Sequence, residues 1–253
     1  MSGEVTLYHW EPVGDSFKAI VCLNEKGVAF TSRYVDVLEF EQYAEDYLAL
    51  SPQARVPVLV HGDRVFNEPK LLCEYIEDAF PEPALAQPDA AGWYDVQEWI
   101  RYVDGQFAEA VNLLGWYTVM LPAMGDAARA SFDARLAAVP VREQLAGWAA
   151  VVRDAESMED RLENARAKVR EALPRVERTL SSSDWLVAGR YSIADISAYA
   201  WLRSLPALMP TEIDPEHTPG VTAWLARVAS RDAVHRAETL ARRDPGTGLF
   251  SPA

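Results

Sequence analysis

Cysteine is scarce in this sequence. The two cysteines, Cys22 and Cys73, do not form a C-x-x-C pair and are too few for a disulfide framework or a zinc site. Free cysteine is among the most often buried residue types, so we expect both to pack in the core. The four histidines show no H-x-x-x-H or H-E-x-x-H spacing, so the sequence gives no support for a metal site.

Positive charge and long apolar runs are also in short supply. The chain has 24 Lys and Arg against 38 Asp and Glu, a formal net charge of -14. This balance argues against a nucleic-acid partner and against an anionic membrane surface. No segment approaches the ~20 apolar residues of a membrane-spanning helix, and the first residues lack the features of a signal peptide. We therefore expect a cytoplasmic protein.

Three common catalytic motifs are missing as well. The chain contains no G-x-S-x-G, no P-loop and no G-x-G-x-x-G, which sets aside α/β-hydrolase, nucleotide and dinucleotide functions. What is present is a chain of 253 residues with 49% hydrophobic content. That is enough core for two modest domains or one large domain.

The first 80 residues alternate between strand and helix patterns. We predict these elements: strand 5–10, helix from 16 to about 27, strand 30–37, short acidic helix 39–49, a hairpin around 61–63 and a helix over 70–79. This order predicts a small α/β domain with a mixed sheet over residues 1–80. Residues 80–89 then contain three prolines, and because proline blocks both helix and ladder we predict a linker at 81–91.

The remainder, residues 92–253, shows helical patterns almost throughout. Apolar stripes predict long helices over 93–114 and 141–180 and a last helical region over 219–240, with a loose tail from 242. Glu163 with Arg166, and Glu171 with Arg175, are spaced to pair on a solvated face. Residues 192–195, Ser-Ile-Ala-Asp, form a capping box that starts another helix.

Two stretches carry the strongest resemblance to a known family: residues 55–59, Arg-Val-Pro-Val-Leu, and residues 189–195, Gly-Arg-Tyr-Ser-Ile-Ala-Asp. With the α/β domain, the linker and the helical remainder, they make nearly the whole chain resemble the glutathione transferase family. The resemblance implies a thioredoxin-like N-terminal domain with a mixed four-stranded sheet and a C-terminal helical bundle. It also implies glutathione as cosubstrate, a small aromatic substrate in the helical domain and a homodimer.

A narrower resemblance points to the bacterial glutathione-dependent β-etherases, which cleave aryl ether bonds of lignin fragments. It depends on residues 14–18, 73–81, 102–104, 115–116 and 139–145, and on Trp148. It implies that a thiolate attacks an electrophilic carbon of an aromatic substrate and displaces a phenolate. The hydroxyl of Ser16, near the positive end of a helix, would stabilise that thiolate. The alternative is that Ser16 only caps the helix, a position that favours serine.

The resemblance also implies binding roles. For glutathione the candidates are Asp15, Lys18, Gln42, Arg55, Val56, Glu68 and Pro69. Val56 would offer its backbone to the cysteinyl part, and Glu68 would meet the γ-glutamyl ammonium. Lys18 or Arg55 would meet a glutathione carboxylate, unless each is a solvated surface charge. Tyr102, Trp116, Tyr117 and Trp148 would line the aromatic acceptor site, unless they are core residues.

Two prolines in the 51–69 stretch affect which backbone groups are available to a ligand. Pro57 has no N–H for a sheet partner, so it belongs at a strand start or edge, or where the backbone serves a ligand. A cis Val56-Pro57 bond would leave the Val56 backbone free, although X-Pro bonds are cis only ~5% of the time. Pro69 stands where the family usually has a serine whose hydroxyl and N–H hold the γ-glutamyl carboxylate.

The Pro69 departure leaves alternatives open: weak or different glutathione binding, another thiol, or a non-catalytic binding protein with this fold. A relative that reduces disulfides or peroxides is disfavoured, because serine and not cysteine occupies the nucleophile region.

Overall fold

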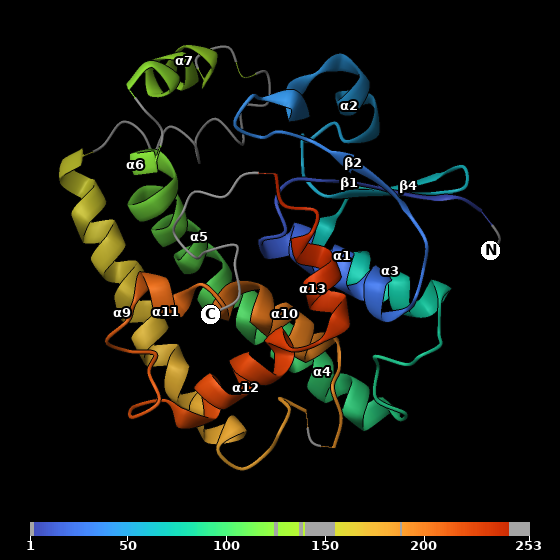
Figure 1. Ribbon diagram of the computed structural model, residues 1–253, viewed down its shortest axis with the longest axis vertical. Helices are drawn as coiled ribbons and strands as arrows, with labels where there is room; N and C mark the ends of the chain where they lie inside the picture. Colours follow the sequence, from blue (N-terminus) through green and yellow to red (C-terminus); the bar gives the residue numbers. More distant parts are fainter. Residues whose placement is uncertain (1–2, 124–125, 137–138, 140–154, 188, 243–253) are drawn as a thin grey trace.

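The N-terminal part of the chain is a four-stranded mixed sheet with helices on both faces (Figure 1). The computed structural model describes residues 3–123, 126–136, 139, 155–187 and 189–242. The elements are β1 (Val5–His9), α1 (Gly14–Glu25), β2 (Thr31–Tyr34), η1 (Glu41–Tyr43), α2 (Glu45–Leu50), β3 (Val58–His61), β4 (Arg64–Phe66), η2 (Pro69–Leu71) and α3 (Leu72–Ala79). The strand order is β2-β1-β3-β4, with β1 parallel to β2 and antiparallel to β3. The prediction of a mixed four-stranded sheet is confirmed.

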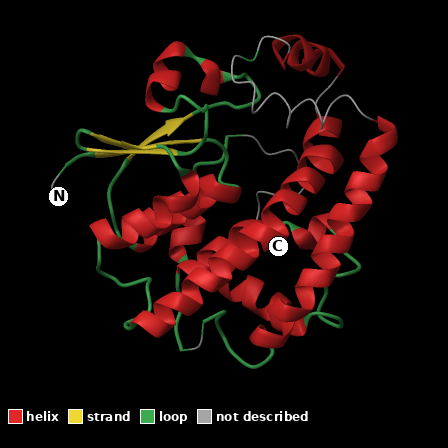
Figure 2. Ribbon diagram, turned by 180° about the vertical axis from the view of Figure 1, so that it is seen from behind, coloured by secondary structure: helices red, strands yellow, loops and turns green. Residues whose placement is uncertain are grey.

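The sheet is held by alternating apolar side chains. In β1 every second residue is buried, beginning with Val5, and Leu7 lies opposite Leu59 of β3 in the antiparallel register. Helices α1 and α3 cover one face and α2 lies on the other (Figures 1 and 2). Cys22 of α1 and Cys73 of α3 are both buried free thiols, as the sequence predicts.

The strand predicted at 30–37 is shorter than expected. It ends at Tyr34, and the Oδ1 atom of Asp36 then accepts hydrogen bonds from the N–H groups of Leu38 and Glu39. Such a side-chain turn diverts the backbone from the ladder. The acidic helix predicted at 39–49 is split into η1 and α2 by Ala44, whose backbone is extended with φ of -64° and ψ of 147°.

The second part of the chain is helical and fills the other end of the molecule (Figure 2). Its elements are α4 (Ala90–Val103), η3 (Asp104–Ala108), α5 (Glu109–Gly115), η4 (Trp116–Met120), α6 (Leu121–Ala123), α7 (Asp126–Leu136), α9 (Ala155–Leu180), α10 (Ile193–Leu202), α11 (Leu205–Leu208), α12 (Pro219–Ala229) and α13 (Asp232–Glu238). No helix or strand occurs in the described stretch between Ala79 and Ala90, where we place the linker. The tail expected to be loose lies outside the described residues, apart from Arg242.

The helix predicted over 93–114 continues to Ala123 and includes two π-helical turns, η3 and η4. Across η3 the buried residues Val103, Phe107 and Val111 stay four residues apart, so the spacing of apolar residues does not reveal this turn. Single π-helical turns within α-helices occur frequently at functional sites. Here they carry Asp104 and Trp116, both of which line the cavity described below.

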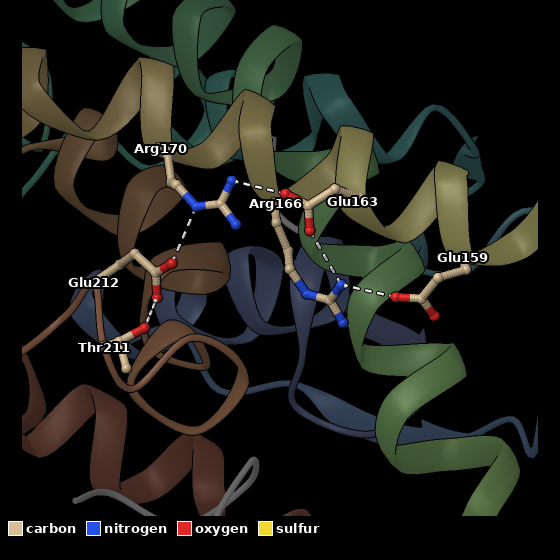
Figure 3. A network of polar contacts seen from close by, with 6 residues as sticks. All are labelled: Glu159, Glu163, Arg166, Arg170, Thr211 and Glu212. Atoms are coloured by element: carbon tan, nitrogen blue, oxygen red, sulfur yellow. Dashed lines mark hydrogen bonds and ion pairs between the residues drawn. The ribbon is translucent and has the colours of Figure 1, made fainter.

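Helix α9 has the predicted buried face and a solvated face of ion pairs. Glu163 pairs with Arg166 at 3.4 Å, as predicted, and with Arg170, which also reaches Glu212 (Figure 3). Arg175 instead pairs with Glu98, on α4. Exposed pairs of this kind contribute about 0–1 kcal/mol each, so they add little to stability. Residues 141–154, predicted to begin this helix, lie outside the described residues.

The predicted capping box is present at the start of α10. The carboxylate of Asp195 is fully buried and accepts hydrogen bonds from the N–H groups of Leu186 and Ser192 and from the indole N–H of Trp224. Burial raises the pKa of Asp195 to about 6, although these donors act in the opposite direction. One carboxylate therefore joins α10, α12 and the preceding loop.

Helix α1 belongs to both parts of the molecule. It packs against α3 beneath the sheet and also against α10 and α13 (Figure 1). The N-terminal end of α1 consequently lies where the two parts meet. Among the described helices none is long and apolar enough to cross a membrane.

Candidate functional site

A cavity of about 910 Å³ opens where the N-terminal end of α1 faces η3, α5 and η4. This volume is in the range of small-molecule binding sites. The predicted site residues that line it are Asp15, Ser16, Gln42, Arg55, Val56, Glu68, Pro69 and Trp116. They come from separate parts of the sequence, and the fold brings them to one wall or another of the same space.

Ser16 is not the cap residue of α1. The helix begins at Gly14, so Ser16 lies in its first turn, and the cap position is Val13, which makes no side-chain capping bond. The first N–H groups of a helix have no intrahelical partner and carry its positive end. The Oγ atom of Ser16 accepts a hydrogen bond from the Trp10 N–H at 3.3 Å, which leaves its own O–H to donate elsewhere. The capping explanation of this serine is therefore wrong.

Val56 and Glu68 lie on the same side of the cavity. The Val56-Pro57 peptide bond is cis, and Val56 precedes β3 instead of pairing within it. Glu68 occupies the position before η2, without a capping bond of its own, and Pro69 is the first residue of that short helix. The Glu68 carboxylate forms an ion pair with the Arg55 guanidinium, and both side chains are 44% exposed.

Gln42 forms a buried part of the cavity wall. It is 2% exposed, and its Nε2 atom donates to the Val37 carbonyl at 3.4 Å. Its Oε1 atom is also buried and has no hydrogen-bond partner among the described residues. A buried amide oxygen without a partner is uncommon, which makes it a candidate acceptor for a ligand N–H.

Lys18 differs from both expectations for it. It is 3% exposed, so it is not a surface charge, and it is not among the cavity-lining residues. Its Nζ atom lies 3.0 Å from Asp15 and 2.9 Å from Asp104. Burial alone would lower the pKa of Lys18, but the two carboxylates outweigh burial and raise it. The ammonium therefore stays charged at neutral pH and joins α1 to η3.

The three aromatic candidates that the structure describes are not brought together. Trp116 lines the cavity and stacks on Trp10 with ring centroids 5.7 Å apart and planes inclined by 10°. Tyr102 points into the helical core, where its hydroxyl donates to the Ala172 carbonyl. Tyr117 packs against the core and is not among the lining residues. Trp148 lies outside the described residues.

Several residues of the cavity wall were not predicted from the sequence. Trp10, Gly14, Lys70, Glu109, Asn112 and Trp201 all line the cavity. Gly14 has φ of 51°, and a Cβ atom there would lie 2.7 Å from the Trp201 ring, so glycine is required both by conformation and by close approach. Trp10 directly follows β1, a position typical of binding residues in α/β folds. The strand predicted over 5–10 included Trp10, so this position was not recognised from the sequence.

We predict that Lys18→Met destabilises the protein by about 3–5 kcal/mol, because it leaves two carboxylates facing each other without their cation. Lys18→Met combined with Asp104→Asn should recover part of this loss. Urea unfolding of the wild type, both single variants and the double variant measures the coupling. Lys168→Met, a lysine on α9 outside this network, is the control and should change stability by less than about 0.5 kcal/mol. Strictly additive losses would contradict the buried network.

Comparison with known proteins agrees with this architecture. Family models match at residues 7–84, the glutathione S-transferase N-terminal domain, and at residues 140–232, the glutathione S-transferase C-terminal domain. Protein LigF of Sphingobium sp. strain SYK-6 is 32% identical over 236 residues, 90% of each chain. The crystal structure of β-etherase LigF has a TM-score of 0.81 and covers 92% of this chain and 98% of its own.

More distant proteins share the same fold. A glutathione S-transferase of Arabidopsis thaliana is 26% identical over 220 residues, which is 86% of this chain and 89% of its own. A Phanerochaete chrysosporium glutathione transferase, crystallised with oxidized glutathione, is 19% identical with a TM-score of 0.73 over 94% of both chains. The family models and the extent of the similarity to LigF establish that this chain is a member of the glutathione S-transferase family.

Proposed function

We propose that this protein is a glutathione-dependent transferase that cleaves β-aryl ethers. The observation that carries the proposal is the position of the Ser16 hydroxyl at the N-terminal end of α1, in a cavity that also holds a stacked aromatic pair. The similarity to LigF, a protein described as a β-etherase, supports the choice of ether cleavage among transferase reactions. The substrate is then a small aromatic molecule.

The first requirement of this chemistry is a thiolate. A free thiol has a pKa of ~8.5 and is only a few per cent ionised at neutral pH. Lowering that pKa by ~2 units takes ~2.7 kcal/mol of preferential stabilisation of the anion. The Ser16 O–H donates one charge-assisted hydrogen bond, and the N–H groups of the first turn of α1 add the positive end of the helix.

The second requirement is that the tripeptide be held with its sulfur at Ser16. The Val56 backbone pairs with the cysteinyl part, and the Glu68 carboxylate accepts the γ-glutamyl ammonium. Asp15, which like Ser16 lies in the first turn of α1, and the buried amide of Gln42 complete the proposed glutathione wall. Lys18 acts from behind this wall, through its contact with Asp15.

The third requirement is an electrophilic carbon opposite the sulfur. The stacked rings of Trp10 and Trp116 form an apolar face on which an aromatic substrate packs. The thiolate attacks the carbon that bears the ether oxygen, a C–S bond forms, and the C–O bond breaks. The electron pair leaves with the phenolate, which takes a proton from solvent. The products are a glutathione thioether and a phenol.

We predict that Ser16→Ala lowers kcat/KM about tenfold to a hundredfold, the loss expected for one charge-assisted hydrogen bond. The acidic limb of its pH–rate profile should move to higher pH, because less of the bound thiol is ionised. A model β-aryl ether that releases a coloured phenol gives the rate. Ser230→Ala, an exposed serine on the C-terminal side of α12, is the control. Full activity with an unchanged profile would remove Ser16 from the mechanism.

For Trp116→Ala we expect a severalfold to about tenfold higher KM for the aryl ether, because stacked aromatic contacts contribute about 0.5–1.5 kcal/mol. Glutathione affinity, measured by calorimetry, should stay within about twofold. Tyr117→Phe is the matched control, since Tyr117 does not line the cavity, and its KM should equal that of the wild type. Equal KM values for Trp116→Ala and the wild type would place the acceptor elsewhere.

The two alternative hypotheses from the sequence, a non-catalytic binding protein and a disulfide-reducing enzyme, are less well supported. A binding protein without catalysis was suggested by Pro69, yet the extended similarity to LigF and to a plant glutathione S-transferase favours an enzyme. A disulfide-reducing relative needs a nucleophilic thiol. The two cysteines of the chain are both buried, and burial raises the pKa of Cys22 well above its usual value. Neither thiol is therefore suited to that chemistry.

We also propose that the protein forms a homodimer in the cytoplasm, where thiols are kept reduced. In the described part of the chain, the large apolar side chains of Val65, Leu71 and Tyr94 are exposed on β4, η2 and α4. A second copy of the chain would cover them. Sedimentation equilibrium should give twice the mass of the chain for the wild type and a weakened dimer for Leu71→Glu. A monomer at micromolar wild-type concentration would exclude the dimer, and cell fractionation checks the location.

A further inference from the structure

The amino-acid end of glutathione sets a requirement that residues 68 and 69 do not meet alone. This end carries an ammonium and a carboxylate on the same carbon. Glu68 can accept the ammonium, but the next residue, Pro69, has no N–H and no polar side chain. Because Pro69 offers no donor, the carboxylate needs donors from another part of the wall. This inference rests on the proposed binding of glutathione.

Positive charge is limited at this wall. Among the described residues that line the cavity, only Arg55 and Lys70 carry a cationic side chain. Lys70 is 58% exposed at its side chain, and its Nζ atom is 4.0 Å from Asp104. Lys18 is held by two carboxylates behind the wall. Arg55 is the cation that is already in contact with Glu68.

We propose that Arg55 and Glu68 act together as a clamp for the α-amino-acid end, with Arg55 supplying the donors that Pro69 cannot. A guanidinium has five N–H donors in a planar fork. The structure engages its Nη1 atom with the Oε2 atom of Glu68. The other donors suit a carboxylate, for which arginine is the preferred bidentate partner, and the second oxygen of Glu68 accepts the ammonium. The ligand ammonium then lies beside the Glu68 carboxylate and the ligand carboxylate beside the Arg55 guanidinium. Each of the four charges therefore has an opposite charge as its neighbour.

The backbone of Arg55 is fixed on both sides, which separates it from an ordinary surface arginine. Its N–H donates to the Ser51 hydroxyl at 2.9 Å, and its carbonyl accepts from the Tyr47 hydroxyl at 2.7 Å. Ser51 and Tyr47 are both buried. An exposed ion pair by itself stabilises a fold by about 0–1 kcal/mol, so a contribution to stability does not explain the Arg55–Glu68 pair. A backbone held in place lowers the entropy lost when the side chain binds a ligand.

The test compares glutathione with an analogue in which 4-aminobutanoyl replaces the γ-glutamyl group and which therefore lacks the α-carboxylate. We expect the wild type to bind glutathione about tenfold to a hundredfold more tightly than the analogue, the loss of one or two charge-assisted hydrogen bonds. Arg55→Ala should abolish this preference and bind the analogue as the wild type does. Adding Pro69→Ser to Arg55→Ala should restore part of it. Calorimetry gives each Kd, and urea unfolding confirms that each variant is folded.

Controls and outcomes separate the two proposals. Arg64→Ala removes an exposed arginine outside the cavity and should keep the full preference. A preference that survives Arg55→Ala, or that is lost in Lys70→Ala instead, overturns the clamp while leaving glutathione binding intact. Equal weakening of both ligands by Arg55→Ala also overturns it, because the α-carboxylate would then not be the group that Arg55 contacts. A wild type that gives no heat with millimolar glutathione overturns the proposed function itself, and the clamp with it.

Discussion

The buried ammonium of Lys18 holds together the two surfaces between which the cavity lies. It joins Asp15, in the first turn of α1, to Asp104, in the π-helical turn η3. Removing three charged groups from water is costly, so such a network contributes less to stability than its short distances suggest. Its effect is positional, because the ammonium fixes the N-terminal end of α1 relative to the helix that carries Trp116. The distance from Ser16 to the aromatic wall depends on this contact.

Much of the fold was predictable because the deciding signals are local. The mixed sheet followed from the order of short apolar runs, and the start of α10 followed from the Ser192–Asp195 capping box, which the structure contains. Element ends were less predictable. The Asp36 turn shortens β2, and two π-helical turns lie between α4 and α6. The spacing of apolar residues does not reveal either feature, since the turn depends on hydrogen bonds to the Asp36 side chain and the π-helical turns depend on backbone hydrogen bonds.

The site shows the same division between local and tertiary information. Ser16, Val56 and Glu68 lie in short motifs, and the fold places all three at the cavity. Lys18 was expected at the surface or at a ligand because lysine is rarely buried. Its partner Asp104 is 86 residues further along the chain, so its burial was not readable from its neighbours. Tyr102 points into the core for an equivalent reason, since its hydroxyl partner belongs to α9.

Pro69 favours the start of η2 but removes a hydrogen-bond donor from the ligand site. Proline favours the first position of a helix, because its φ is already set and its missing N–H would have no partner there. The same missing N–H is a donor lost to any carboxylate bound at this end. Arg55 offers its donors from a loop whose backbone is fixed by Ser51 and Tyr47. In the proposed clamp, recognition of the carboxylate therefore depends on the half-exposed charge of one side chain, and salt screens such a charge.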